Sequence, residues 1–153
     1  MTRHDAMMSM KSRVVALPAS HHDVLLGAVH GVLTTVMPNG QPQSSIVWVD
    51  FDGVFLLVNT ALERSKGRNM QANPRVSLLV IDPQNSNRWI EVRGLVVEIT
   101  RAGAEAHADL LAQRYCGKSR FYGGVLSMEQ RERETRVIAK IEPIKVSLDA
   151  IFK

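Results

Sequence analysis

The chain has 153 residues, of which 45% are hydrophobic and 22% charged, and this composition is that of one ordinary globular domain. Aromatic residues make up 5% of the sequence, which disfavours a surface that stacks unpaired nucleic-acid bases on aromatic rings. The formal net charge of +4 admits anionic partners but does not choose among phosphates, nucleic acids and membrane surfaces.

The single cysteine, Cys116, excludes a disulfide within the chain and indicates a reducing compartment. No apolar run reaches the length of a membrane span, and the apolar stretch near the N-terminus is too short for the core of a signal peptide. We therefore expect a cytoplasmic protein, with residues 1–19 as a flexible leader and residues 20–153 as a single domain.

The first half of the chain predicts a short helix followed by strands. Ser20 and Asp23 have the spacing of a capping box, and the helix that they begin ends at Gly31. Three β-rich segments follow, and short turn sequences with glycine separate them, which is typical of an antiparallel meander. The predicted strands span residues 32–36, 43–49 and 54–58, and the turns span residues 38–40 and 52–53.

A second short helix is predicted directly after this meander. Thr60 with Glu63 has the spacing of another capping box, and Ser65 is an alternative cap. Pro74 requires the helix to end before it.

The second half of the chain alternates strands and helices in a similar way. Gly94 indicates a bulge or bend in a long strand, Gly117 caps the most regular helix, and Pro143 interrupts the last strand. The strands span residues 75–81, 89–99 and 137–148, and the helices span residues 102–115 and 128–135. Six antiparallel strands with a few flanking helices favour a mainly β fold, a small closed or nearly closed barrel.

Three basic residues, Arg64, Lys66 and Arg68, lie at the start of the second helix. Cations oppose the dipole of a helix N-terminus, so this arrangement makes sense if an anion sits among them, with the hydroxyls of Thr60 and Ser65 as further donors. The alternative is a solvated, charged helix face. Because residues 64 and 66 do not share a helical face, both reach one phosphate only if Arg64 lies before or at the first turn.

The second predicted strand carries Gln43, two serines and Trp48, so it is neither a clean core strand nor a clean surface strand. Flat ring systems can lie along such a strand and bind its backbone. Alternatively the strand has one wet face, and Trp48 packs in the core or against another subunit.

Sequence motifs for other chemistries are missing. The five histidines have no metal-ligand spacing, and the glycines match neither a dinucleotide fingerprint nor a phosphate loop. We therefore predict no metal site and no catalytic side chain. A cofactor that performs the chemistry itself would account for this pattern.

The order of these features resembles the pyridoxamine 5′-phosphate oxidase-like FMN-binding split barrels, and most of all their branch of F420-dependent oxidoreductases. The resemblance covers about residues 20–148. The matching segments are residues 31–35, 38–49, 58–60, 64–69, 73–76, 81–83 and 89–94.

This resemblance implies a six-stranded antiparallel split barrel that forms a homodimer, with two cofactor sites at the subunit interface. The residues implied along the isoalloxazine or deazaflavin ring are Ser45, Ile46, Val47 and Trp48. Those implied at the phosphate are Asn59, Thr60, Arg64 and Lys66, with Ser65 beside them. Trp89 would come from the partner subunit, the loop over residues 118–122 would cover the site, and Arg68 would meet a longer anionic tail or contribute surface charge alone.

The resemblance also implies a function, hydride transfer between bound F420 or FMN and a small unsaturated or quinone-like substrate. The alternative is a non-catalytic carrier of the cofactor or a redox sensor. Vitamin B6 oxidation is not expected, because Gln43 replaces an arginine of the true oxidases and residues 148–153 lack their tryptophan and arginine. We expect neither nucleic acid nor a membrane as a partner.

Overall fold

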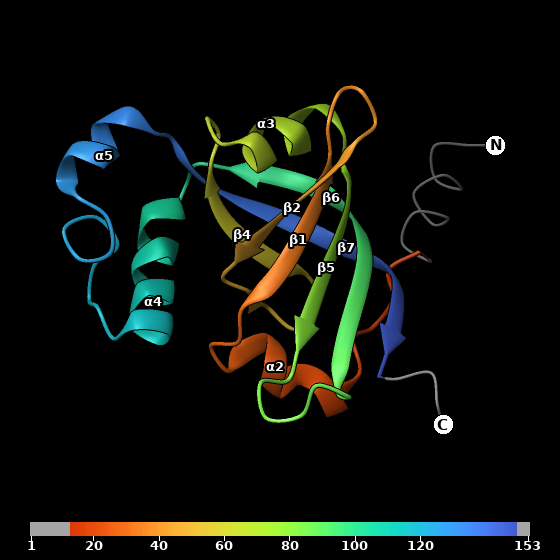
Figure 1. Cartoon of the computed structure of the whole chain (residues 1–153). Helices are drawn as coiled ribbons and strands as arrows, with labels where there is room; N and C mark the ends of the chain where they lie inside the picture. Colours follow the sequence, from red (N-terminus) through yellow and green to blue (C-terminus); the bar gives the residue numbers. More distant parts are fainter. Residues whose placement is uncertain (1–12, 150–153) are drawn as a thin grey trace.

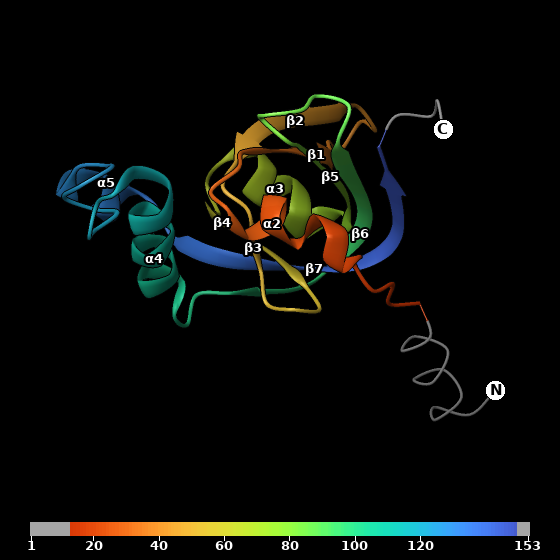
Figure 2. The same ribbon diagram turned by 90° about the horizontal axis from the view of Figure 1, so that it is seen from below.

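The strands of the chain form one antiparallel sheet in a computed structural model that describes residues 13–149 (Figure 1). The sheet has seven strands in the order β2-β1-β5-β6-β7-β4-β3. Their bounds are β1 Gly31–Val36, β2 Pro42–Val47, β3 Asp50–Phe51, β4 Leu56–Ala61, β5 Arg75–Ile81, β6 Trp89–Thr100 and β7 Arg136–Leu148. Figure 2 shows this sheet curling into an incomplete ring, which confirms the predicted mainly β split barrel.

The helices lie at the ends and on one flank of this barrel. A 3₁₀ turn, Ala19–His21, leads into α2, His22–Leu26, and α3 spans Ser65–Ala72. α4, Ala104–Cys116, and α5, Met128–Arg133, stand outside the barrel on the side of β4 (Figures 1 and 2). The long strands β6 and β7 pair along most of their length and join this flank to the rest of the sheet.

The core of the barrel consists of the side chains that point inward from its strands. Alternate residues of β4, of β5 and of the first half of β6 are buried while their neighbours are partly or fully exposed, which is the period of two expected of a half-buried strand. The largest fully buried side chains of this core are Leu25, Leu33, Leu56, Leu78, Ile90 and Ile141.

Most predicted strands are present, with shifted ends. The bounds of β5 agree with the prediction, whereas the predicted strand 43–49 lies at Pro42–Val47 and the predicted strand 54–58 at Leu56–Ala61. The two-residue strand β3 was not predicted. The bulge predicted at Gly94 is confirmed by a shift in the β6–β7 register, and a Cβ there would lie 2.6 Å from the carbonyl oxygen of Glu142. β7 continues through Pro143 because that register shift faces it.

The predicted end and cap of the first helix are wrong. Gly31 belongs to β1, where the side chains of neighbouring strands leave no room for a Cβ, and the helix ends at Leu26. The hydroxyl of Ser20 contacts His21 Nδ1 at 2.9 Å rather than capping, and Asp23 pairs with Arg88 instead.

The predicted caps of α3 are wrong as well. Arg64 occupies the N-cap position without a side-chain cap bond, and Ser65 is the first helical residue. The carboxylate of Glu63 accepts a hydrogen bond from the backbone N–H of Thr135 at 2.8 Å, so it ties the loop before α3 to the segment before β7.

The chain before the first helix contributes to the barrel. The backbone N–H of Val15 donates to the carbonyl of Pro143 at 2.9 Å, and Leu17 is buried in the main core. Residues 1–12, most of the leader predicted from the sequence, lie outside the described residues. Within residues 13–149, no helix is both long enough and apolar enough to cross a membrane.

Candidate functional site

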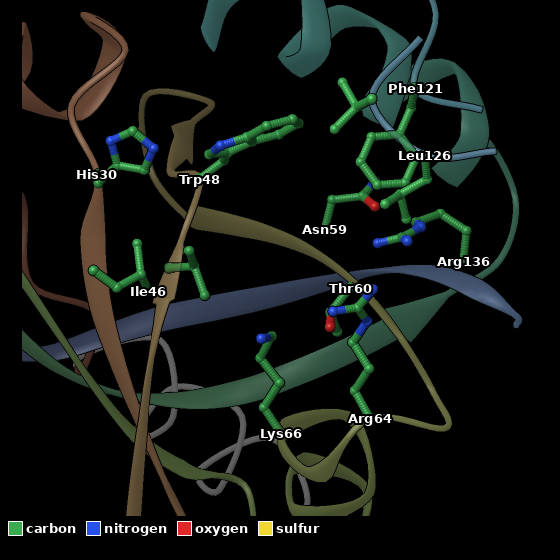
Figure 3. Close-up of a pocket in the computed structure, with 12 residues that line it drawn as sticks. His30, Ile46, Trp48, Asn59, Thr60, Arg64, Lys66, Phe121, Leu126 and Arg136 are labelled. Atoms are coloured by element: carbon green, nitrogen blue, oxygen red, sulfur yellow. The ribbon is translucent and has the colours of Figure 1, made fainter. Parts of the chain in front are cut away.

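A cavity of about 300 Å³ opens between the β2 end of the sheet and the flank that carries α4 (Figure 3). Its walls combine a cationic end, an aromatic side and a loop after α4. The lining residues are His30, Ile46, Val47, Trp48, Asn59, Thr60, Arg64, Lys66, Phe121, Val125, Leu126 and Arg136.

The start of α3 places Arg64 and Lys66 at the cationic end. Arg64 has an extended backbone at the N-cap, so both side chains can face one point although they do not share a helical face. Gly67 lets α3 lie directly on the end of β4, because a Cβ there would be 2.2 Å from the carbonyl oxygen of Ala61. Lys66 Nζ donates to the hydroxyl of Ser45 at 3.2 Å, which links α3 to β2.

Arg136, the first residue of β7, brings a third cation to this end. Burial, together with the charges of Arg64 and Arg136, holds the pKa of Lys66 below its usual value. Both arginines contact Glu134, whereas Lys66 has no carboxylate partner within residues 13–149. Three cations and one carboxylate leave a net charge of +2, which suits an anion.

Two buried polar atoms in the cavity wall have no hydrogen-bond partner among the described residues, Thr60 Oγ1 and Asn59 Oδ1. A buried polar atom without a partner is costly, and such an atom in a cavity indicates a ligand or a water. The Thr60 hydroxyl can donate to an anion held by Lys66 and Arg64, so the donor set fits a phosphate group.

The aromatic side of the cavity is built around Trp48. Its indole stacks on Tyr115 at 5.2 Å between ring centroids, with an interplanar angle of 13°, and meets Phe121 edge-on at 5.9 Å. Tyr115 is fixed in turn, because its hydroxyl accepts from the backbone N–H of Val49 and donates to the carbonyl of Val29, each at 2.8 Å. The cavity therefore has a rigid flat wall, and Ile46 beside it is 67% exposed.

We expect Tyr115→Phe to lower the free energy of unfolding by about 1–2 kcal/mol, because a partly buried backbone N–H and a carbonyl lose their partner. Urea denaturation measures this. Leu110→Ala is the control, since Leu110 is 52% exposed on the same helix and its loss should cost under about 0.5 kcal/mol. Equal losses in the two variants would contradict the prediction.

The loop after α4 lines one side of the cavity through Phe121, Val125 and Leu126. It is held by Glu134, which accepts from the Tyr122 hydroxyl at 2.6 Å and also contacts the Arg136 guanidinium. Burial raises the pKa of Glu134, but hydrogen bonds from Tyr122, Gln130 and Arg136 outweigh it and hold the pKa below its usual value. The Arg136 guanidinium also lies over the ring of Phe121, 4.4 Å from its centroid.

The structure brings most of the sequence-predicted site residues together. Ser45 contacts Lys66 rather than the cavity, and Ser65 does not line it. The predicted residues that line it are Ile46, Val47, Trp48, Asn59, Thr60, Arg64 and Lys66. The loop expected over the site contributes Phe121 from its predicted span, together with Val125 and Leu126 beyond it.

Two predicted residues lie away from the cavity. Arg68 is exposed, and its guanidinium turns back onto the carbonyl of Glu63. Trp89 begins β6, where its backbone N–H donates to the side chain of Asp149 at 3.1 Å. The role implied for Trp89 concerns a partner subunit and stays a prediction.

Sequence reasoning missed His30 and Arg136. His30 directly precedes β1 and lies at the opposite end of the cavity from the cations (Figure 3). Arg136 ends a run of charged residues, and no periodicity distinguishes it from its exposed neighbours. Arg136 is the first residue of β7, and its guanidinium is buried against the rings of Phe121 and Tyr122.

Comparison with known proteins agrees with this geometry. The pyridoxamine 5′-phosphate oxidase family matches residues 17–148. A solved F420 reductase is 35% identical, with a TM-score of 0.72 over 86% of this chain and 98% of that one. A conserved hypothetical protein from Mycobacterium tuberculosis is 23% identical, with a TM-score of 0.66 over 90% of this chain and 87% of that one. General Stress Protein 26 from Bacillus anthracis is 20% identical, with a TM-score of 0.57 over 93% and 95%. The last two share the fold alone.

Proposed function

The chain belongs to the pyridoxamine 5′-phosphate oxidase family, in its F420-dependent branch, and from this membership we propose that it is an oxidoreductase that binds F420 or FMN. The observation that carries the proposal is the cationic end of the cavity beside a flat aromatic wall. Such a cavity suits a ligand that carries an anionic group next to a planar ring. F420 and FMN both do so, with a phosphate and a flavin-type ring system.

Each part of the cavity has a role in this proposal. Arg64, Lys66 and Arg136 hold the phosphate by charge, and the Thr60 hydroxyl donates to it. Trp48 bounds the space for the ring, and Phe121 of the loop after α4 packs edge-on against it. When bound, a deazaflavin or flavin supplies hydride transfer to or from a small unsaturated or quinone-like substrate. The protein contributes position and a cationic surrounding, so no side-chain acid or base is required.

F420 is favoured over FMN by one comparison, since the solved structure at 35% identity is an F420 reductase. The net charge of +2 suits the phosphate of either cofactor, and the carboxylates of an F420 tail extend the anionic part further. Oxidation of vitamin B6 is not part of the proposal, because Gln43 is where the true oxidases place an arginine.

Homodimerisation also belongs to the proposal, because the split barrels that the chain resembles place their cofactor sites between two subunits. Ile46, exposed beside the cavity, suits a surface that a partner covers. Analytical ultracentrifugation of the purified chain tests this. We expect twice the 17.0 kDa mass of one chain, and a sedimenting monomer at micromolar concentration would contradict it.

The function is tested by purifying the protein from its own source and recording its absorption and fluorescence, followed by turnover with a panel of quinones and enones. We expect bound F420 or FMN and acceptor-dependent oxidation of the reduced cofactor. A bound cofactor without turnover would favour the carrier or redox sensor. If the protein bound neither F420 nor FMN, the proposal would be contradicted.

A further inference from the structure

Four polar side chains form a chain of contacts that ends at the wall of the cavity. Arg114 Nη1 donates to Asp50 Oδ1 at 2.8 Å, and His107 Nε2 lies 2.8 Å from Asp50 Oδ2. The other ring nitrogen, His107 Nδ1, lies 3.1 Å from Asn59 Nδ2. The series therefore runs from an arginine on α4, through β3 and back through α4, to Asn59 on β4.

The chemistry of the partners fixes which way the Asn59 amide faces. The Asn59 atom 2.8 Å from the carbonyl oxygen of Ala104 must be the nitrogen, because a carbonyl oxygen only accepts. Its second hydrogen points to His107 Nδ1, which must then carry a lone pair. The ring proton therefore sits on Nε2 and faces Asp50.

Asp50 holds this arrangement as a carboxylate. Burial raises its pKa, but hydrogen bonds from His107, Arg114 and the backbone N–H of Phe51 outweigh burial and lower the pKa to about 2. Arg114 pairs with Asp50, so the negative charge of this carboxylate has a cationic partner. Both Asp50 and His107 are nearly buried, with side chains 12% and 11% exposed, which keeps the series rigid.

With both amide hydrogens in use, Asn59 can offer the cavity only its carbonyl oxygen. That oxygen, Oδ1, is buried without a partner among the described residues, although Asn59 lines the cavity (Figure 3). A phosphate oxygen beside it would be repelled, because both atoms are hydrogen-bond acceptors. The resemblance, which implies Asn59 at the phosphate, therefore conflicts with the orientation of the amide.

We infer that Asn59 accepts a hydrogen bond from an N–H or O–H group of the bound ligand, and that Asp50 and His107 hold its amide in the accepting orientation. This rests on the proposed function, since F420 and FMN share both donors, the imide N–H of the ring and the hydroxyls of the polyol chain. Because Oδ1 is buried, the hydrogen bond from the ligand donor to Oδ1 forms away from water.

The first test is fluorescence titration of the full chain with FMN, with 3-methyl-FMN and with an FMN analogue whose polyol hydroxyls are replaced by hydrogen. We expect one analogue to bind the unsubstituted protein about tenfold more weakly than FMN. In Asn59→Leu, that analogue and FMN should bind equally. 3-Methyl-FMN identifies the ring as the donor, and the other analogue identifies the polyol chain. If the ratio of FMN affinity to analogue affinity is the same in Asn59→Leu as in the unsubstituted protein for both analogues, the inference is overturned.

The second test needs neither a ligand nor a substitution. In ¹⁵N-labelled protein, the histidine side-chain spectrum should show His107 protonated at Nε2 and unprotonated at Nδ1. A proton on Nδ1 overturns the inference, because Asn59 would then turn its oxygen toward the ring.

The positioning role of His107 has a separate readout. His107→Phe should reduce the ratio between FMN and the discriminating analogue, while Arg64→Ala weakens FMN and the analogue by the same factor. An unchanged ratio in His107→Phe overturns the positioning role. Absence of FMN and F420 binding overturns the proposed function together with the inference. Cofactor binding that depends on Lys66 but shows no coupling to Asn59 overturns the inference alone.

Discussion

Replacing Arg64 and Lys66 together by alanine is expected to weaken FMN or F420 binding at least about 100-fold. Hydrogen bonds to charged groups contribute about 1.5–3 kcal/mol each, so the loss of two corresponds to about 3–6 kcal/mol. Both side chains line the cavity, and Lys66 has no carboxylate partner in the described part of the chain. Titration by cofactor fluorescence measures the change.

Arg68→Ala is the matched control, since Arg68 lies one turn further along α3 and turns back onto the backbone of Glu63. Its removal should change cofactor affinity less than about threefold. A loss as large as that of the double variant would show that the anion sits further along α3 than we propose. An unchanged affinity in the double variant would remove the phosphate assignment altogether.

Lys66, which we expect to strengthen cofactor binding, should at neutral pH destabilise the cofactor-free protein. Burial and the neighbouring arginines lower the pKa of Lys66, so the unfolded chain binds its proton more tightly than the folded chain does. Stability should therefore rise with pH from the lowered pKa up to the usual value of 10.5. Lys66→Met should be at least as stable as the unsubstituted protein at neutral pH and should lack this rise. Denaturant midpoints across pH, without cofactor, measure both effects.

Most strands of the fold were predictable because residues close together in the sequence indicate where each strand begins and ends. Alternating and β-branched residues marked six strands, and turn sequences with glycine marked where the chain reverses. β3 was missed because two residues carry no period, and it separates from β2 only where Trp48 and Val49 leave the ladder. The pairing of β1 with β5 and of β4 with β7 depends on long-range packing, which periodicity does not report.

The candidate site was predictable in part for a similar reason. Arg64 and Lys66 follow a strand and begin a helix, so their neighbours in sequence indicate an anion site. The condition that Arg64 precede the first helical turn is confirmed by its place at the N-cap. Arg136 and His30 arrive from distant segments and follow no motif, and the orientation of Asn59 depends on His107, 48 residues away in sequence.

Glu134→Gln is expected to lower the free energy of unfolding by about 3 kcal/mol, because it leaves Arg136 buried without its carboxylate. The same change should strengthen phosphate binding, since the net charge of the cationic end rises from +2 to +3. Thermal unfolding with and without inorganic phosphate measures both, because a ligand that binds the folded state stabilises it by an amount that grows with the logarithm of its affinity.

The pH dependence separates the charge of Glu134 from its packing. Its pKa is held below the usual value of 4.5, so its contribution to stability is present above that value and is lost as the pH falls toward the lowered pKa. Glu134→Gln should lack this acid-dependent loss. Glu132→Gln, on the exposed face of α5, is the control and should change neither stability nor phosphate binding by more than about 0.5 kcal/mol. If Glu134→Gln reduced the stabilisation by phosphate, Glu134 would help to hold the anion rather than limit the charge that attracts it.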